Sequence, residues 1–525
     1  LFNAQGVNNI YSGLYLSNSA GGTIEVSVGT LNLFGGVSSF TNLILNGDGG
    51  LNFYGRVDVT NGDLRINDSG PGRFYGPVSV ASSIVIGGGG VDAQFLTNTA
   101  YNYHDQQSGG RTVFSGGATT NQSGGFLRYG STMIVEGSNT TFYTVTVGNQ
   151  FATWGMGRWS YNSTLLVSNG ASFESRGSLF TGDYFSGNNW FILTDPGTRG
   201  TIGGRPILGG YGHQFDGGPS SDTHLMVSNG AKLTINSNPN FGGHLYIDFS
   251  DGNNHSAIIT DPGTELNVQG WIYVGDGGNN GFPRSSYDSL QIYNGAMVTA
   301  AALSVAPGGG YYRNHWVTIS GSNSLLRTDY ISVGESKYSN RLDILDGGCA
   351  VVAGTFWLGA YGDNPADNSE VNVVGGTLII TNTGRLYVGW EAPNQRMTVS
   401  NNSLVYVDTD LIMGYQYNAI ASTGNTFTID SSTVIVTNAG GTARLIVGER
   451  GGGTFYLNSG TVIADHLYAT NTGQSLVVFN GGTINTLGDS IIDMGSNTMT
   501  IGSEYGSGSG WNILGGNNRL LGTAP

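Results

Sequence analysis

One short motif recurs along most of this sequence and limits what the chain can fold into. An apolar run is followed by Asn-Gly and a small residue in Leu165–Ala171, Leu225–Ala231 and Leu290–Ala296. Looser copies begin at Leu342, Val371, Met397, Phe427, Phe455 and Val477. Self-similarity at a short period is typical of solenoids, in which each unit buries its apolar face only by stacking on its neighbours. The repeat therefore predicts a stacked architecture.

The spacing of the motif predicts three short strands in each repeat. Successive strand starts between Leu225 and Val477 lie 22 to 33 residues apart, with a mean of about 28. One unit contains apolar alternation at Thr426–Ile429, Thr433–Val436 and Arg444–Val447, with turn residues between these segments. Strand-length alternation bounded by Gly, Asn, Asp and Ser indicates strands joined by tight corners.

The first part of the chain has a shorter period, which is marked by aromatic residues. Aromatic positions fall about 20 residues apart, at Phe34, Phe53-Tyr54, Phe74-Tyr75, Phe95 and Phe114. An aromatic residue at one place in every coil predicts a ladder of stacked rings.

Composition supports an all-β fold. The chain has 89 glycines among 525 residues without the three-residue period of collagen, and only 10% of its residues are charged. Its 38% hydrophobic content is enough to build a core, which argues against disorder. The variable spacing argues against a propeller, whose blades are longer and more regular. We therefore predict a right-handed parallel β-helix (β-solenoid) of about twenty irregular coils of roughly 20–33 residues.

The change of period suggests four segments. We expect an N-terminal cap or assembly segment at 1–22 and a β-helix with shorter coils at 23–130. A β-helix with longer coils and loop insertions is expected at 131–487, followed by a C-terminal cap or assembly segment at 488–525.

Charge and cysteine content exclude several kinds of partner. The net charge is −15, and the 20 basic residues form no cluster, so we expect no nucleic-acid binding. No run of 18 apolar residues occurs, so we expect no membrane insertion. The single cysteine, Cys349, excludes an intrachain disulfide framework and is predicted to be a small core residue.

Two segments resemble a known family. Val317–Gly359 resembles the passenger repeats of autotransporter-like bacterial surface proteins, and Thr112–Gly117 resembles the autotransporter-associated β-strand repeat. The resemblance covers most of the chain from about residue 20 to 490 and implies a secreted β-solenoid at a bacterial cell surface.

A catalytic site is the less favoured interpretation of one carboxylate pair. Asp408 and Asp410 occupy alternate positions that we predict to face one side of a single strand, and the next coil supplies Arg444. Paired carboxylates suit general acid–base chemistry on a polysaccharide. Solvent-facing aspartates at alternate strand positions are the simpler interpretation, and we expect the chain not to be an enzyme.

Two loops carry candidate ligands for a hard cation. Asp92 follows the glycine run 87–90, and Asp363, Asp367 and Glu370 lie close together in one segment. Oxygen ligands of this kind suit Ca²⁺, although solvation explains most such loops. We expect that no cofactor is required and that Ca²⁺ is a possible ligand.

Aromatic residues suggest glycan contacts as an alternative to core packing. The segment Gly209–Asp216 carries Tyr211 and Phe215 beside a histidine and an aspartate. Tryptophans provide further candidates at Trp154, Trp159, Trp190, Trp271, Trp357 and Trp390. Stacking inside the core is the commoner use of such rings.

The main prediction is a secreted, non-enzymatic structural β-solenoid that assembles with copies of itself into an extracellular filament, sheath or layer. The only lysines are Lys232 and Lys337, so strand edges lack a common device against edge-to-edge pairing. An adhesin or glycan-binding passenger is the alternative, and a polysaccharide-degrading β-helix is the second alternative.

Overall fold

The computed structural model describes most of the chain as short β-strands. The described residues are 6–19, 21–67, 70–87, 91–101, 103–107, 109–121, 124–144, 153–156, 161–182, 186–209, 220–237, 242–249, 252–275, 286–307, 314–335, 339–359, 368–416, 422–469, 475–493, 500–501 and 509–521. No helix occurs among them. A search of these same residues therefore finds no helix with the length and hydropathy to cross a membrane.

The chain divides into two compact units. Unit 1 comprises 1–245, 251–258 and 263–269, and unit 2 comprises 246–250, 259–262 and 270–525. The division passes through β30 (Leu245–Ile247), β32 (Ser256–Thr260) and β33 (Glu265–Val274).

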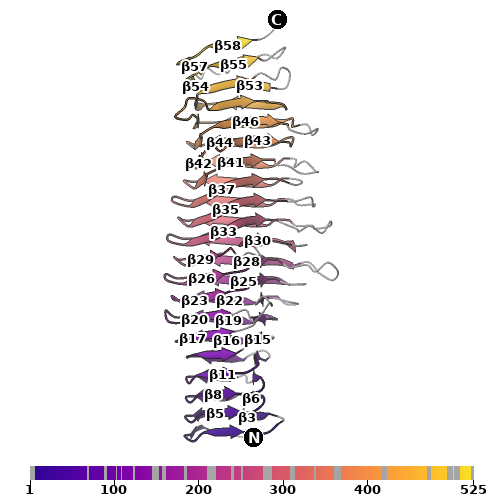
Figure 1. Cartoon of the computed structure of the whole chain (residues 1–525), viewed down its shortest axis with the longest axis vertical. Coiled ribbons are helices and arrows are strands. Elements are labelled where there is room, and N and C mark those ends of the chain that lie inside the picture. The colour runs from indigo at the N-terminus through magenta and orange to yellow at the C-terminus, as the bar shows by residue number, and fades with distance from the viewer. Residues whose placement is uncertain are drawn as a thin grey trace. The chain divides into compact units, whose positions relative to one another are not determined.

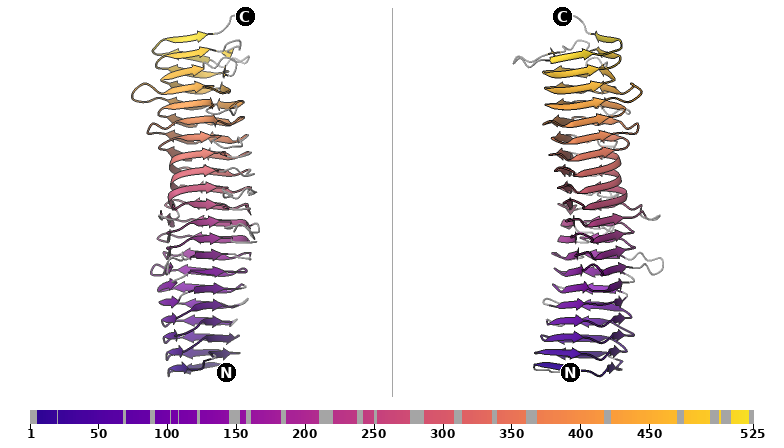
Figure 2. Two further views of the ribbon diagram at one scale, coloured as in Figure 1. Left: turned by 45° about the vertical axis from the view of Figure 1, so that its right-hand side comes forward. Right: turned by 90° about the vertical axis from the view of Figure 1, so that its left-hand side faces the viewer.

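In unit 1 every printed strand pair is parallel, and the strands form three stacks, one for each side of a coil (Figures 1 and 2). The first stack contains β1 (Val7–Ile10), β4 (Thr30–Leu33), β7 (Gly50–Phe53), β10 (Pro71–Phe74), β13 (Asp92–Phe95), β16 (Arg111–Ser115), β19 (Thr132–Glu136), β22 (Thr164–Ser168), β25 (Gly187–Leu193), β28 (Ser220–Val227) and β31 (Gly252–Asn253). The second contains β2 (Leu14–Leu16), β5 (Val37–Ser39), β8 (Val57–Val59), β11 (Val78–Val80), β14 (Thr99–Tyr101), β17 (Ala118–Asn121), β20 (Thr141–Thr144), β23 (Ser172–Ser175), β26 (Arg199–Ile202) and β29 (Lys232–Ile235). The third contains β3 (Gly22–Val26), β6 (Leu43–Gly47), β9 (Leu64–Ile66), β12 (Ser83–Ile86), β15 (Tyr103–Gln106), β18 (Gly124–Leu127), β21 (Thr153–Met156), β24 (Leu179–Thr181) and β27 (Pro206–Leu208).

Unit 2 repeats the three parallel stacks. The first contains β34 (Ser289–Tyr293), β36 (Trp316–Ser320), β38 (Arg341–Leu345), β41 (Glu370–Val374), β44 (Arg396–Ser400), β47 (Asn425–Ile429), β50 (Gly453–Leu457), β53 (Ser475–Phe479) and β56 (Thr500–Ile501). In two coils one long strand, β35 (Met297–Val305) or β37 (Leu325–Val333), serves both the second and the third stack. The second stack continues with β39 (Cys349–Val352), β42 (Thr377–Ile380), β45 (Leu404–Val407), β48 (Ser432–Val436), β51 (Gly460–Ala464), β54 (Gly482–Thr486) and β57 (Ser509–Ile513). The third continues with β40 (Phe356–Leu358), β43 (Leu386–Trp390), β46 (Asp410–Tyr415), β49 (Arg444–Val447), β52 (His466–Ala469), β55 (Ser490–Asp493) and β58 (Asn518–Leu521). The predicted all-β parallel β-helix is confirmed.

Side-chain alternation explains why these segments become strands. In β47 the side chains of Phe427 and Ile429 are buried, whereas Thr426 and Thr428 face outward. A period of two places every second residue in the interior of the coil. Apolar residues meet at the same position in successive coils, because a one-residue slip would move the whole apolar set to the surface.

The predicted spacing of the repeats in unit 2 matches the strand register, although each strand begins one or two residues before its predicted start. The three segments predicted within one unit lie inside β47, β48 and β49. Each predicted strand start pairs with the next one along the chain, in the pairs Leu290–Val317, Val317–Leu342, Leu342–Val371, Val371–Met397, Met397–Phe427, Phe427–Phe455 and Phe455–Val477.

The aromatic ladder predicted for the shorter coils is two ladders. Phe53, Phe74, Phe95 and Phe114 stack inside the coils, with ring centroids 4.7, 4.8 and 5.1 Å apart. Tyr11, Phe34, Tyr54 and Tyr75 stack outside, with centroids 4.8, 4.6 and 4.7 Å apart. The prediction that Phe34 shares one place in the coil with Phe53 was wrong, because Leu33 holds the position in register with Phe53.

The prediction that Cys349 is a core residue was also wrong. In β39 the side chains of Ala350 and Val352 are buried, and Cys349 faces outward in a half-buried position. It lies in register with Leu325 and Thr377. Burial nevertheless raises the pKa of its thiol above the usual value.

Candidate functional site

A column of buried polar side chains runs along one corner of unit 2. Each member is buried and lies at the start of a strand of the first stack, either directly before the strand or, for the last member, as its first residue. The column consists of Asp288, His315, Asn340, Ser369, Gln395 and Asn425, and we call it the corner column. Buried polar groups need hydrogen-bond partners, so its members require a specific arrangement.

The corner column exists because the chain turns sharply one residue earlier. The preceding residues have left-handed backbone conformations, with φ of 65° at Tyr287, 60° at Asn314, 60° at Ser339, 60° at Asn368, 58° at Asn394 and 69° at Gly424. Asn and Gly enter this region at low cost, whereas a bulky residue there is uncommon. Tyr287 is therefore the exception in this set.

Two asparagines of the corner column accept hydrogen bonds from backbone amides of the preceding coil. The amide of His315 donates to Asn340 Oδ1 at 3.3 Å, and the amide of Gln395 donates to Asn425 Oδ1 at 2.9 Å. Gly389 packs against Asn425 with φ of 84°, where a Cβ would collide with the asparagine side chain. These contacts fix the corner without a charged group.

His315 is neutral in this corner. Burial lowers its pKa from the usual 6.5 to about 3, because the charged ring loses its hydration. The backbone amide of Asp288 donates to Nδ1 at 3.3 Å, so this nitrogen acts as an acceptor. Asp288 Oδ2 lies 3.2 Å from the same nitrogen. A neutral ring that accepts a hydrogen bond at Nδ1 carries no proton on that nitrogen. The short distance between Nδ1 and Asp288 Oδ2 is therefore not a conventional ion pair.

A pocket of about 280 Å³ opens beside the corner column. Four successive coils line it with Tyr287, Asn314, His315, Trp316, Ser339, Asn340, Arg341, Asn368 and Glu370. Ser289, Trp316, Arg341 and Glu370 hold equivalent positions in paired strands. Ser289 is buried, whereas the side chains of Trp316, Arg341 and Glu370 reach the surface. The pocket thus combines two aromatic rings, three amides, a guanidinium and a carboxylate.

The charges in the pocket are already balanced. Arg341 Nε lies 2.7 Å from Asp343 Oδ2, and Glu370 Oε1 lies 3.9 Å from Arg396 Nη1. The aromatic and amide side chains carry no charge at neutral pH. The pocket therefore presents hydrogen-bonding groups without a net field that would select a strongly charged ligand.

The predicted cation ligands are placed separately. Glu370 lies in the pocket, while Asp363 and Asp367 fall outside the described residues. Asp92 begins β13 and accepts hydrogen bonds from Arg111 Nη1 at 2.8 Å and from Gln94 Nε2 at 3.0 Å. Residues 88–90 of the preceding glycine run also lie outside the described part.

The structure corrects the predicted arrangement of Asp408 and Asp410. They do not share a strand, since β45 ends at Val407 and β46 begins at Asp410. Asp410 is buried, and its carboxylate accepts two hydrogen bonds from Arg444, at 2.9 and 2.7 Å. Arg385 Nε lies 3.3 Å from Asp410 Oδ2. The two guanidiniums give Asp410 a structural role in joining coils.

The candidate aromatic residues have different environments. Trp154 is fully buried in the core of unit 1, and Trp190 packs against His224 with centroids 4.2 Å apart. In unit 2, Trp271, Trp357 and Trp390 stack on Tyr273, Tyr330 and Tyr415. Trp159 and residues 210–216 of the aromatic segment lie outside the described residues.

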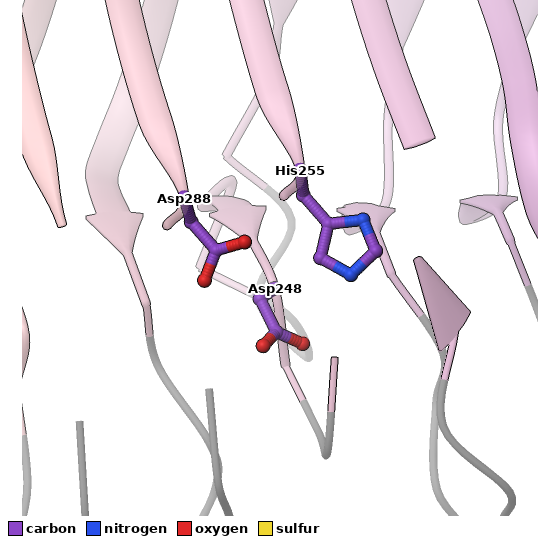
Figure 3. Close-up of side chains that lie close together, drawn as sticks. All are labelled: Asp248, His255 and Asp288. Atoms are coloured by element: carbon purple, nitrogen blue, oxygen red, sulfur yellow. The ribbon is translucent and has the colours of Figure 1, made fainter. Parts of the chain in front are cut away.

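Figure 3 shows the carboxylates of Asp248 and Asp288 with the ring of His255. All three residues are buried. His255 belongs to unit 1 and the two aspartates to unit 2. Each of the three residues already takes part in interactions with other groups, so we assign no metal to them.

Comparison with protein-family models, curated proteins and solved structures finds no match to this chain.

The pocket was not predicted from the sequence, although the spacing of the repeats indicates which residues line it. The predicted strand starts are 27, 25 and 29 residues apart over these coils, and the same steps connect Tyr287, Asn314, Ser339 and Asn368. Alignment of the repeats on these steps would have placed these four residues in one column.

Proposed function

We propose that this chain is a non-enzymatic structural β-solenoid of a bacterial cell surface, which assembles with copies of itself into an extracellular filament, sheath or layer. The parallel β-solenoid is compatible with such a role. The proposal depends most on the exposed strand edges of the outermost described coils.

In unit 1 the first described coil has an apolar, uncharged edge. β1 and β2 contain no charged residue, and among the described residues each pairs with a later strand only. Val7, Tyr11 and Tyr15 are 71%, 73% and 70% exposed. Unpaired strand edges without charges or bulges are templates for further pairing.

In unit 2 the last described coil has an edge that also exposes apolar residues, although β58 contains one charged residue, Arg519. β57 and β58 pair with the earlier strands β54 and β55 within the described part of the chain. The exposed apolar residues here are Ile513, Leu514, Leu520 and Leu521. Parallel strands of this kind can be extended by a further coil without a change of register.

Sedimentation velocity over a range of concentrations, with electron microscopy of the same samples, tests the proposal. We expect the 525-residue protein to form linear or lateral assemblies, and Asn9→Lys in β1 to weaken them by placing a charge on the edge. Phe40→Lys is the matched control, because Phe40 is exposed on a later coil outside any strand.

A protein that stays monomeric at every concentration, with no fibre or layer, overturns the proposal. If Asn9→Lys assembles like the unmodified protein, the contact does not use the edge of β1.

A further inference from the structure

We propose that the pocket beside the corner column binds one ring of a neutral saccharide. Tyr287, Trp316, Arg341 and Glu370 line this pocket within unit 2. Ligand binding there does not depend on self-assembly of the protein.

The volume of the pocket suits a small, ring-sized ligand. About 280 Å³ lies at the lower end of the range for small-molecule sites. Its lining comes from strands and from the turns that directly precede them. A site built on paired strands holds its side chains at fixed spacing, which favours recognition of a rigid ring.

The aromatic groups fit the apolar face of a sugar. Trp316 is only partly buried and is paired in register with Ser289 on one side, a residue too small to cover an indole ring. This differs from the exposed ladder of unit 1, in which Phe34 and Tyr54 stack face to face on their neighbours. In the outer ladder of unit 1, the ring faces are therefore occupied by neighbouring rings. Trp316, in contrast, has only the small residue Ser289 as its in-register neighbour on one side.

The polar groups fit hydroxyls better than ions. A hydroxyl both donates and accepts a hydrogen bond, and the lining provides a donor at Arg341, an acceptor at Glu370 and amides at Asn314 and Asn368. The carboxylate disfavours a phosphate or sulfate, and the guanidinium disfavours a cation. A neutral polyhydroxyl ligand satisfies this mixture most completely.

Tyr287 points to the same conclusion independently. It is 53% exposed and has φ of 65°, at a turn position where Asn314, Asn368 and Asn394 represent the favourable choice. Strained backbone positions are concentrated at functional sites. A bulky aromatic ring stands here against the local preference, and it lines the pocket.

Titration with soluble oligomers of glucose, mannose, galactose and N-acetylglucosamine tests the inference, with calorimetry and tryptophan fluorescence as readouts. We expect at least one oligomer to bind with one site per chain. Trp316→Ala should weaken its affinity at least about tenfold, as expected for the loss of a stacking ring. Trp271→Ala, an exposed tryptophan of the same unit outside the pocket lining, is the matched control and should bind normally.

Tyr287→Asn separates loss of binding from loss of folding. Asn suits the left-handed turn, so the melting temperature should stay the same or rise while the affinity falls. Retention of full affinity in both Tyr287→Asn and Trp316→Ala overturns the inference.

Two further results contradict a saccharide site. One is the absence of heat and of fluorescence change with every oligomer at millimolar concentration. The other is saturable binding of CaCl2 alone that is abolished by Glu370→Gln, since it would identify the pocket as a cation site. A sugar site should instead be unaffected by a chelator.

Discussion

The coils of both units stack through parallel strands, but the segments that connect the strands differ in length between the two units. In unit 1 between Thr30 and Arg111, strand partners of the first stack lie 19 to 21 residues apart. Identical phenylalanine rings meet in successive coils from Phe53 to Phe114. In unit 2 partners of that stack lie 22 to 30 residues apart between Leu290 and Thr500. The apolar interior is conserved in both, so variation in coil length is confined to the corners. Constant coils favour ladders of like residues, and variable coils bring unlike residues together, as in the pocket.

Removal of a ring from the inner ladder should have the largest effect. Phe74 is fully buried between Phe53 and Phe95, so Phe74→Ala should lower the free energy of unfolding of its region by about 3–5 kcal/mol. Tyr75→Ala, in the half-exposed outer ladder, should lower it by about 1–2 kcal/mol. Hydrogen exchange of β10 amides measures both. Equal effects would show that the inner and outer ladders contribute alike.

Acid should destabilise unit 1 through His104 and unit 2 through His315. Burial lowers the pKa of His104 to about 4, opposed by its contact with Gln106 and by Asp105, and lowers that of His315 to about 3. The unfolded chain takes up these protons near pH 6.5 and the folded chain does not, so stability falls as the pH decreases from about 6.5 towards these values. The expected loss at pH 5 is about 2 kcal/mol for each histidine.

Urea midpoints at pH 7 and pH 5 test this expectation. His104→Gln and His315→Gln should each flatten the pH dependence, whatever their effect at pH 7. If neither variant changes the slope, other groups cause the acid sensitivity.

Two tyrosine hydroxyls, one buried and one partly exposed, should respond in opposite ways. The hydroxyl of Tyr101 in unit 1 is buried without a hydrogen-bond partner among the described residues, so Tyr101→Phe should be neutral or stabilise by up to about 1 kcal/mol. In unit 2 the hydroxyl of Tyr406 donates to the carbonyl of Thr437 at 3.1 Å, and Tyr406→Phe should cost about 1 kcal/mol. Denaturant unfolding of both variants checks the contrast, which a destabilised Tyr101→Phe would contradict.

The smallest expected effect concerns the outward position of Cys349. Cys349→Ser should change the free energy of unfolding by less than about 0.5 kcal/mol. Ala350→Ser, one residue further along the same strand, places a hydroxyl in the core and should cost about 1–3 kcal/mol. Thermal unfolding distinguishes them, and a large loss for Cys349→Ser would restore a core role for this residue.

The sequence predicts the fold of unit 2 well because burial and register impose the same pattern. Leu290, Val317 and Leu342 are apolar at one place in each coil, and the intervals between them are the register itself. The two ladders of unit 1 were merged because Phe34 and Phe53 differ by one position in the coil, which sends their side chains to opposite faces.

Site residues were harder to predict, because corner geometry determines where their side chains lie. Asp408 and Asp410 read as one alternating strand, yet the chain bends between them and buries Asp410 against Arg444. The pocket likewise depends on left-handed turns in four coils of unequal length. The alternation of apolar and polar residues does not predict a left-handed turn at a position where Tyr or Ser stands in place of Asn or Gly.

The hydrogen bonds of the corner column have a direction, which bears on how the chain is made. The backbone amide of His315 donates to the side chain of Asn340, and the backbone amide of Gln395 donates to the side chain of Asn425. In both bonds the acceptor comes later in the chain than the donor. Each of these corners is completed by the coil that follows it along the chain. A polypeptide that emerges amino end first supplies these coils in the required order, so such corners can be closed one after another during synthesis. The hydrogen bonds of the corner column thus favour folding of the coils in chain order, from the amino-terminal coils to the carboxyl-terminal ones.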